Sequence, residues 1–220
     1  MASIRLSRQT RLVRFLSSDG LNLEGRLTPG ANDRAAVLCH PHPLHGGSML
    51  TPVIMTAEQA FAEAGYTTLA FNFRGVGGSE GVHDEGRAEV GDVTGALDFL
   101  MERVGVPPTL QVVAGYSFGS VVGGRVAAAD RRVRLYLGIA PPLNLDDFGF
   151  LRSWGGRVAF IAASHDEFCD RDRLETLGAA LPRNAWLRTL DTNHFFERKL
   201  EELAQACRDV AVWAGDGETA

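Results

Sequence analysis

Two short segments near the start of the chain alternate apolar and polar residues, as the strands of a hairpin do. The first spans residues 11–16 and the second residues 21–27, and the turn-forming residues Ser18-Asp19-Gly20 lie between them. A period of two places every second side chain on the same face of a strand. We therefore predict an antiparallel hairpin in this part of the chain.

Beyond the hairpin, short and almost uniformly apolar runs alternate with longer segments of helical periodicity. Strands that are apolar on both faces are typical of a mostly parallel sheet with helices on both sides. The expected strands span residues 35–39, 67–71, 110–114, 133–140, 158–163 and 186–190. The expected helices span residues 52–65 (with Thr51 as N-cap), 90–104, 118–129 and 173–181, and a last one carries Phe196, Leu200, Leu203, Cys207 and Val210 on one face. With the hairpin, this pattern predicts an α/β fold around a twisted, mostly parallel eight-stranded sheet.

Composition narrows the class of protein. The 220 residues, 45% of them hydrophobic, fit one globular domain spanning residues 1–220. A net charge of -5 argues against nucleic acid or an anionic membrane as a partner, because both require a basic face. Three widely spaced cysteines suggest no disulfide framework and suit a reducing compartment. The chain shows no apolar stretch typical of a signal peptide or a membrane span, so we expect a cytoplasmic protein; the oligomeric state stays open.

One serine lies between a predicted strand and a predicted helix, in Gly115-Tyr116-Ser117-Phe118-Gly119. Active sites of parallel sheets lie beyond the carboxyl ends of the strands, where this serine falls. The flanking glycines permit a sharp, strained turn that exposes the serine hydroxyl. The same turn directs the amide of Phe118, at a helix N-terminus, toward an oxygen that gains negative charge. We predict Ser117 as a nucleophile; the alternative is a chance match in a glycine-rich chain.

A serine hydroxyl becomes a good nucleophile when a base takes its proton and an acid orients that base. His194 is the candidate base, because it lies between the last expected strand and the last helix, at the same sheet edge. Asp166 follows the preceding strand and is the leading candidate for the acid, with Glu167 and Asp170 as rivals. Asp191 is disfavoured because it is nearly adjacent to the histidine in sequence.

Three histidines occur in residues 39–47, Cys39-His40-Pro41-His42-Pro43-Leu44-His45-Gly46-Gly47. A metal site is the less favoured interpretation, because no aspartate separates the second and third histidines as in the His-x-His-x-Asp-His pattern of metallo-hydrolases. The favoured interpretation is that this loop supplies the second amide of an oxyanion hole. Pro41 and Pro43 lack an N–H group, which leaves His42 as the best donor and Leu44 as the second. The His42 side chain then lines the pocket.

The glycine-rich segment at residues 74–81 raises the question of a phosphate-binding loop. It has no nearby lysine, and it lacks the final glycine of the dinucleotide fingerprint. We therefore expect a structural loop, anchored by hydrogen bonds of Arg74. Together with the disfavoured metal site, this leaves no cofactor and no metal in the expected site.

Four segments together resemble the α/β-hydrolase superfamily, and in particular a small, lidless family of bacterial serine hydrolases related to dienelactone hydrolase. They are residues 39–47, 72–81, 115–119 and 164–168, and the likeness covers residues 11–213 in order. The chain order Ser117, Asp166, His194 is the order that this superfamily uses. The resemblance implies this catalytic triad and an ester-like bond as target. Dienelactone hydrolase itself uses a cysteine nucleophile, so its substrate is not carried over.

Many superfamily members insert a helical cap after the sixth strand, but residues 141–157 are too few for a cap domain. We therefore expect an open site that hydrolyses carboxylic esters or thioesters of small to medium acyl substrates through an acyl-enzyme. Leu44, Phe168 and Phe195 are the candidates for contact with this small-molecule substrate. A peptidase of the same fold and a non-catalytic binding protein of this fold are the alternatives.

Overall fold

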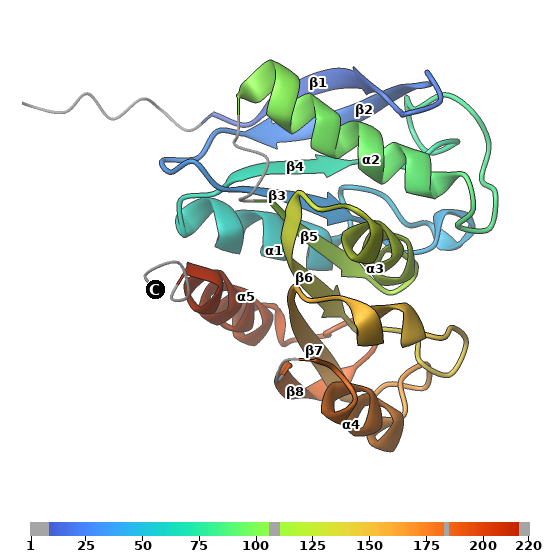
Figure 1. Ribbon diagram of the computed structural model, residues 1–220, viewed down its shortest axis with the longest axis vertical. Helices are drawn as coiled ribbons and strands as arrows, with labels where there is room; N and C mark the ends of the chain where they lie inside the picture. The colour runs from blue at the N-terminus through green and yellow to red at the C-terminus, as the bar shows by residue number, and fades with distance from the viewer. Residues whose placement is uncertain (1–8, 106–110, 183–184, 216–220) are drawn as a thin grey trace, which may run out of the picture.

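The computed structural model describes residues 9–105, 111–182 and 185–215, and its strands form one eight-stranded sheet in the order β1-β2-β4-β3-β5-β6-β7-β8 (Figure 1). The hairpin β1–β2 is antiparallel, β2 pairs antiparallel with β4, and the other neighbours are parallel. The predicted fold class is therefore confirmed. The strands are β1 (Arg11–Leu16), β2 (Asn22–Thr28), β3 (Ala35–Cys39), β4 (Thr67–Phe71), β5 (Gln111–Tyr116), β6 (Val133–Ile139), β7 (Arg157–His165) and β8 (Trp186–Asn193).

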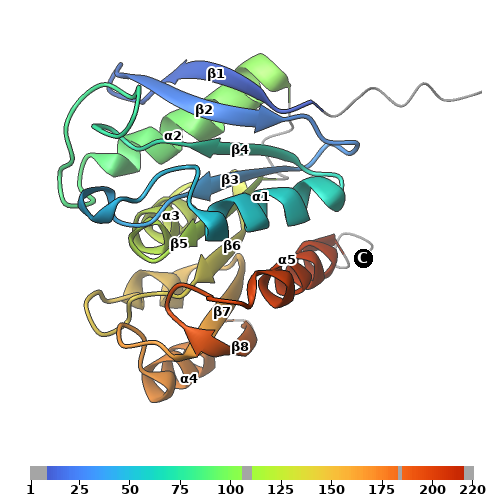
Figure 2. The ribbon, with the colours of Figure 1, turned by 180° about the vertical axis from the view of Figure 1, so that it is seen from behind.

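Helices cover both faces of the sheet. Figure 1 shows α2, α3 and α4 in front of it, and Figure 2 shows α1 and α5 on the opposite face. The helices are α1 (Pro52–Glu63), α2 (Glu89–Phe99), α3 (Phe118–Ala129), α4 (Arg171–Ala179) and α5 (Leu200–Gly215). The shorter helical segments are the 3₁₀ helices η1 (Pro43–His45) and η3 (Gly149–Ser153) and the π-helix η2 (Leu100–Val104). None of the helices in the described ranges combines the length and the apolar composition needed to cross a bilayer.

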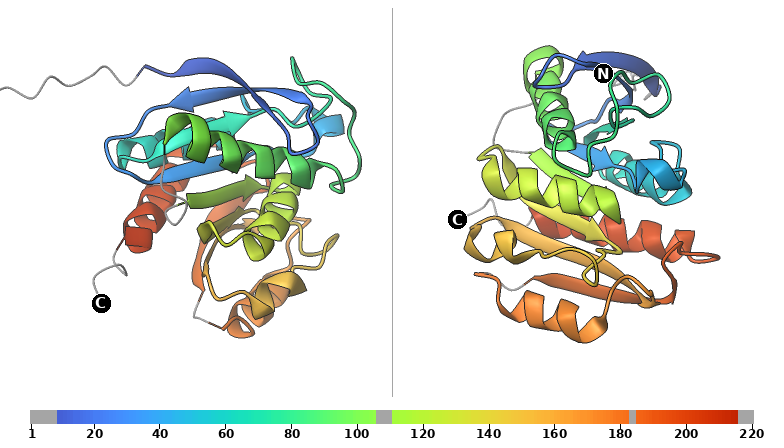
Figure 3. Two further views of the ribbon diagram at one scale, coloured as in Figure 1. Left: turned by 45° about the horizontal axis from the view of Figure 1, so that its top comes forward. Right: turned by 90° about the vertical axis from the view of Figure 1, so that its right-hand side faces the viewer.

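Alternate residues of each central strand point into two separate hydrophobic clusters. In β3, Val37 faces the cluster under α2, α3 and α4, whereas Leu38 faces the cluster under α1 and α5. Full burial of a side chain of this size is worth about 1.5–3 kcal/mol. The central strands are uniformly apolar because both faces of the sheet are buried. Figure 3 shows how this sheet twists from β1 to β8.

The largest difference from the expected strands lies at the end of β8. The apolar pattern ends at Leu190, but the strand continues to Asn193. Its pairing with β7 shifts register beyond Leu190, so that Asn193 lies opposite His165. This extension carries exposed polar side chains such as Asp191, which concealed it in the sequence. The consequence is that His194 follows the end of β8 directly.

Helix boundaries differ where capping decides them. The helix expected at residues 173–181 begins at Arg171, because the Asp170 side chain accepts hydrogen bonds from the amides of Asp172 and Arg173 at 2.8 and 3.4 Å. Thr51 occupies the N-cap position of α1 as predicted, yet its hydroxyl accepts from the Ser48 amide instead of capping the helix.

Phe196 was expected on the last helix, and this prediction is wrong. It has a left-handed φ of 53° ahead of α5, and its ring is nevertheless fully buried with Leu203 and Cys207. The helix expected at residues 90–104 divides into α2 and η2. The expected strand start at Leu110 lies outside the described residues, and β2, β5, β6 and β7 differ from the expected ends by one or two residues.

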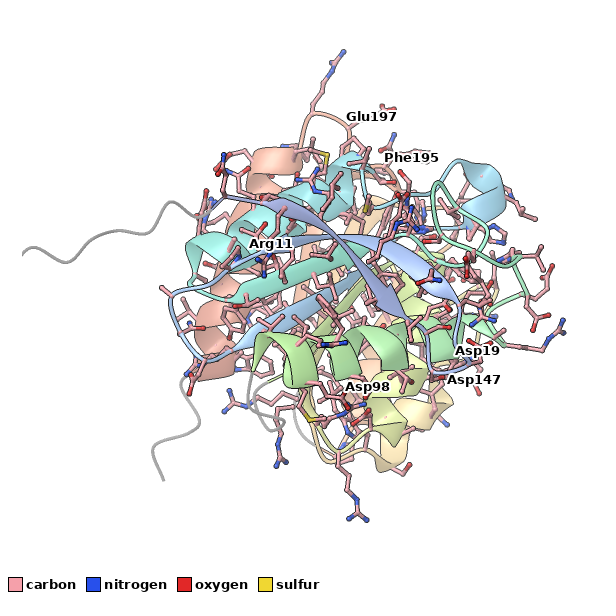
Figure 4. The ribbon with its side chains drawn as sticks, turned by 90° about the horizontal axis from the view of Figure 1, so that it is seen from above. Arg11, Asp19, Asp98, Asp147, Phe195 and Glu197 are labelled. Atoms are coloured by element: carbon pink, nitrogen blue, oxygen red, sulfur yellow. The ribbon has the colours of Figure 1, made fainter. Side chains whose placement is uncertain are left out.

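Arg74 anchors the glycine-rich loop, as predicted. Its guanidinium donates to the buried carboxylate of Asp92 on α2, with the Nη2–Oδ1 distance at 2.7 Å. It also donates twice, at 3.0 Å, to Asp19 in the turn of the hairpin, which is labelled in Figure 4. One buried cation therefore ties together the hairpin, α2 and the loop after β4.

We predict that Arg74→Met destabilises the protein strongly, because it leaves the Asp92 carboxylate buried without its partner. The expected loss is about 3–5 kcal/mol in the free energy of unfolding, measured by urea denaturation. The matched control is Arg87→Met, which removes an exposed ion pair with Asp84 and is expected to leave the urea midpoint unchanged. Equal midpoints for the two variants would contradict this account of the loop.

Candidate active site

Ser117 lies at the turn between β5 and α3 with φ 52° and ψ -120°, a conformation that L-residues rarely adopt. Glycine is required at positions 115 and 119, because backbone carbonyl groups approach both residues too closely to leave space for a Cβ. A Cβ on Gly115 would lie 2.2 Å from the carbonyl oxygen of Gly119, and one on Gly119 would lie 2.2 Å from that of Cys39. The turn is held by the Ser117 amide, which donates to the Ile139 carbonyl at 3.0 Å. The sharp, strained turn expected from the sequence is therefore present.

A continuous chain of hydrogen bonds joins Ser117, His194 and Asp166. His194 Nε2 lies 3.0 Å from Ser117 Oγ, and His194 Nδ1 lies 2.8 Å from Asp166 Oδ2. The side chain of Asp166 is fully buried, and its other oxygen accepts from the Phe168 amide at 2.9 Å. An ionised Asp166 keeps the imidazole proton on Nδ1, which leaves the lone pair of Nε2 facing the serine hydroxyl.

Tyr116 fixes the position of this histidine from the nucleophile's own strand. Its hydroxyl donates to the backbone carbonyl of His194 at 3.0 Å, and the two rings lie 5.4 Å apart. Desolvation of the buried phenol raises its pKa, so the hydroxyl keeps its proton for this bond. Sequence reasoning assigned Tyr116 no role. The sequence feature that could have indicated a role for Tyr116 was its position next to Ser117 in the pentapeptide at residues 115–119.

The rival acids have other partners. Asp170 caps α4. Asp191 is exposed and pairs with His165 at 2.9 Å. Neither of these two residues lines the pocket beside Ser117. Glu167 is exposed, and its backbone carbonyl accepts from the Asn144 side chain. Asp166 is thus the carboxylate that meets His194.

The first histidine of the loop after β3 has a structural role. His40 is buried, its Nδ1 donates to the Pro41 carbonyl at 2.6 Å, and its Nε2 accepts from the Phe73 amide at 3.0 Å. Burial lowers its pKa to about 4, so the ring is neutral at physiological pH. His40 therefore joins the loops that follow β3 and β4.

The second histidine, His42, binds one of the two backbone amides that are candidates for the oxyanion hole. His42 Nδ1 accepts from the Leu44 amide at 3.2 Å, so that N–H is already engaged. Burial, with smaller contributions from His83 and His45, lowers the His42 pKa and favours the neutral ring that this bond requires. By contrast, the N–H groups of His42 and Phe118 donate to no acceptor in the described part of the chain. The rings of these two residues lie 5.1 Å apart beside Ser117.

A pocket of about 630 Å³ opens at Ser117. Of the predicted contact residues, Phe168 and Phe195 line it, whereas Leu44 is 72% exposed and does not. Leu44 points away because the turn of η1 directs it to solvent. Leu145 and Asp146 also line the pocket and were missed, because the connection after β6 has neither a motif nor a periodic pattern. The lining residues are Pro41, His42, His45, Gly46, Gly47, Thr51, Tyr116, Ser117, Phe118, Pro142, Leu145, Asp146, Phe168, His194 and Phe195.

Two further features define what the site contains. The connection between β6 and β7 holds only the short helix η3, so no helical cap covers the pocket from this segment. Across residues 9–105, 111–182 and 185–215, no group of three or more His, Cys, Asp and Glu side chains is arranged to hold a metal ion.

Comparisons with known proteins agree with this architecture. The model of the "Alpha/beta hydrolase family" matches residues 36–218. The structure of a protein of unknown function from Agrobacterium tumefaciens is 32% identical and superposes with a TM-score of 0.86, over 94% of this chain and 98% of that chain. A serine hydrolase without a lid from Xanthomonas campestris is 29% identical with a TM-score of 0.83, over 94% and 96% of the two chains.

A thiohydrolase from Aspergillus aculeatus is 32% identical over 133 residues, which are 59% of this chain. The match spans less than half of that relative, 41% of its length. The family model, in contrast, extends over most of the chain, including the serine turn and the loops that carry Asp166 and His194. The chain is therefore a hydrolase that belongs to the alpha/beta hydrolase family.

Proposed function

We propose that this protein hydrolyses carboxylic esters or thioesters of small to medium acyl substrates, with Ser117, His194 and Asp166 as its catalytic triad. The observation that carries the proposal is the unbroken hydrogen-bond chain from Ser117 Oγ through both nitrogens of His194 to the buried Asp166. It joins a nucleophile, a base and an orienting acid at the floor of an open pocket.

In the first half of the reaction, Ser117 Oγ attacks the acyl carbon while His194 Nε2 takes the serine proton. Asp166 stabilises the imidazolium that forms, through the 2.8 Å contact with Nδ1. Collapse of the tetrahedral intermediate breaks the bond to the leaving oxygen or sulfur, which receives the proton from His194. The alcohol or thiol departs and an acyl-Ser117 ester remains.

In the second half, His194 removes a proton from water as the water attacks the acyl-Ser117 ester. The same imidazolium then returns a proton to Ser117 Oγ, and the carboxylic acid leaves. The open pocket supports this step, because water reaches the ester without the movement of a cap. The net reaction consumes one water and regenerates the free serine.

The negative charge of the tetrahedral intermediate requires amide donors, and we propose the N–H groups of His42 and Phe118. The Phe118 amide is at the N-terminus of α3, where the helix dipole adds positive potential. The His42 amide is held by the turn that its own imidazole closes with Leu44. Donors fixed before the reaction stabilise the transition state without reorganisation.

One relative and the state of the cysteines support two further proposals, on the substrate and on the cellular location. The similarity to a thiohydrolase supports thioesters as substrates beside oxygen esters. We also infer a cytoplasmic location, supported by three cysteines that are all free and buried.

We predict that Ser117→Ala lowers kcat for p-nitrophenyl butyrate by about 10⁴- to 10⁶-fold, because no other group replaces the nucleophile. Steady-state turnover is the measurement. Ser164→Ala is the matched control, since Ser164 is exposed and its hydroxyl donates to the exposed Asp191, and it should keep full activity. Substantial turnover in the Ser117 variant would overturn the mechanism.

The oxyanion assignment predicts different effects for two substitutions at one position. The φ of His42 is -54°, which proline adopts, so His42→Pro removes the N–H without forcing the backbone. We expect this variant to lose about 100- to 1,000-fold in kcat.

The control His42→Ala removes the imidazole but keeps the N–H, and its loss of kcat should be smaller. Thermal unfolding verifies that both variants are folded. Equal losses in the two folded variants, or no loss in His42→Pro, would refute His42 as an oxyanion donor.

A further inference from the structure

The order of the strands gives the pocket two chemically different sides. The loop after β3, with His42 and His45, lies on one side of Ser117, because β3 neighbours β5. The loops after β6, β7 and β8 lie on the other side and contribute Leu145, Phe168 and Phe195, together with Asp146, whose carboxylate pairs with Arg125 at 3.4 Å. His194 is located on this second side, the apolar side, which carries most of the large apolar side chains that line the pocket.

Two aromatic rings of this apolar side flank the proposed base. The Phe168 ring meets the His194 ring edge-on, with centroids 4.8 Å apart, and the Phe195 ring does so at 5.6 Å. Both are anchored through their backbone, since the Phe168 amide donates to Asp166 and the Phe195 amide to the Asn193 side chain. The two rings are thus held beside the imidazole of His194.

Folding does not account for the position of Phe195. Its neighbour Phe196 is completely buried in the core, whereas Phe195 is 61% exposed, and Figure 4 shows it at the surface on the loop ahead of α5. Leu145, on the same side of the pocket, is 71% exposed. Large apolar side chains gathered at the mouth of a site gain free energy when an apolar group covers them.

The proposed mechanism decides which part of a substrate reaches these residues. His194 Nε2 delivers its proton to the leaving oxygen or sulfur, so that atom must come within hydrogen-bond distance, about 2.6–3.2 Å, of Nε2. The first carbon atoms attached to it then lie against the rings that flank His194. The side of the pocket with Phe168 and Phe195 is consequently the leaving-group side.

Building on the proposed ester and thioester hydrolysis, we infer that the site selects substrates whose alcohol or thiol carries an apolar, ring-sized group next to the leaving atom. Phe195 is the specificity-determining residue, and Phe168 and Leu145 complete the subsite. The bond that breaks joins the acyl carbon to the leaving atom, and the departing alcohol or thiol is neutral once His194 has protonated it.

The test uses two butyrate esters, benzyl butyrate and 2-methoxyethyl butyrate, whose alcohols have similar acidity but differ in apolar character. Both give the same butyryl-enzyme, so a difference in kcat/KM reports on the leaving group alone. We expect the wild-type protein to prefer the benzyl ester. Phe195→Ala should lower this preference about three- to tenfold, the range typical of one aromatic contact.

Three controls make the result specific. Phe195→Leu keeps an apolar side chain and should restore part of the preference. Val212→Ala, at an equally exposed apolar position on α5, should leave the preference unchanged. The hydrolysis rate of the isolated butyryl-enzyme should be the same in wild type and Phe195→Ala, because the leaving group has gone by then.

The outcomes separate this inference from the proposed function. No benzyl preference in the wild type, or the same preference in Phe195→Ala, overturns the subsite while the hydrolysis of both esters still supports the triad mechanism. An equal fall for both esters together with slower butyryl-enzyme hydrolysis shows that Phe195 only orients His194, which also overturns the subsite. Failure of the folded wild type to form any butyryl-Ser117 refutes the proposed function itself.

Discussion

The backbone of Ser117 carries the constraint on which the site depends. A positive φ at a non-glycine residue costs on the order of 1–3 kcal/mol and persists only where the surroundings enforce it. Here the bond from the Ser117 amide to the Ile139 carbonyl holds the turn, and Gly115 leaves room for it, because a Cβ at that position would lie 2.2 Å from the Gly119 carbonyl oxygen. Because β5 is fully buried and most residues of α3 are buried as well, the fold as a whole supports this turn. The strain brings Oγ to the carboxyl edge of the sheet, within reach of His194.

The partners of Ser117 reach that edge because neighbouring strands end there. The register shift between β7 and β8 extends β8 by a few polar residues, so His194 leaves the sheet at the level of Ser117. Tyr116 then ties the His194 carbonyl back to β5, and Asp166 approaches from the end of β7. The geometry around the serine thus comes from three strands of one rigid sheet, which is the form of preorganisation that catalysis requires.

Much of this arrangement could be predicted from the sequence, for reasons that are physical. Ser117, Asp166 and His194 each follow an apolar run, and the carboxyl ends of parallel strands meet at one edge. The sequence favoured Asp166 over Glu167 and Asp170, but it could not exclude these rivals, because the curvature of the loop and the capping of α4 by Asp170 are visible only in the structure. The burial of Phe196 beside the exposure of Phe195 was equally hidden, since it depends on a loop in which Phe196 and Arg198 both have a left-handed φ. Leu145 and Asp146 lie in an irregular connection whose path no periodicity encodes.

The most direct test of the account is to trap the acyl-enzyme. Wild-type protein mixed with p-nitrophenyl butyrate, quenched in acid within the first turnover and digested, should show the mass of one butyryl group on the peptide that contains Ser117. The same treatment of Ser117→Ala should show no butyrylated peptide. A butyryl group on another residue, or an unmodified Ser117 while ester is being hydrolysed, would contradict the central claim.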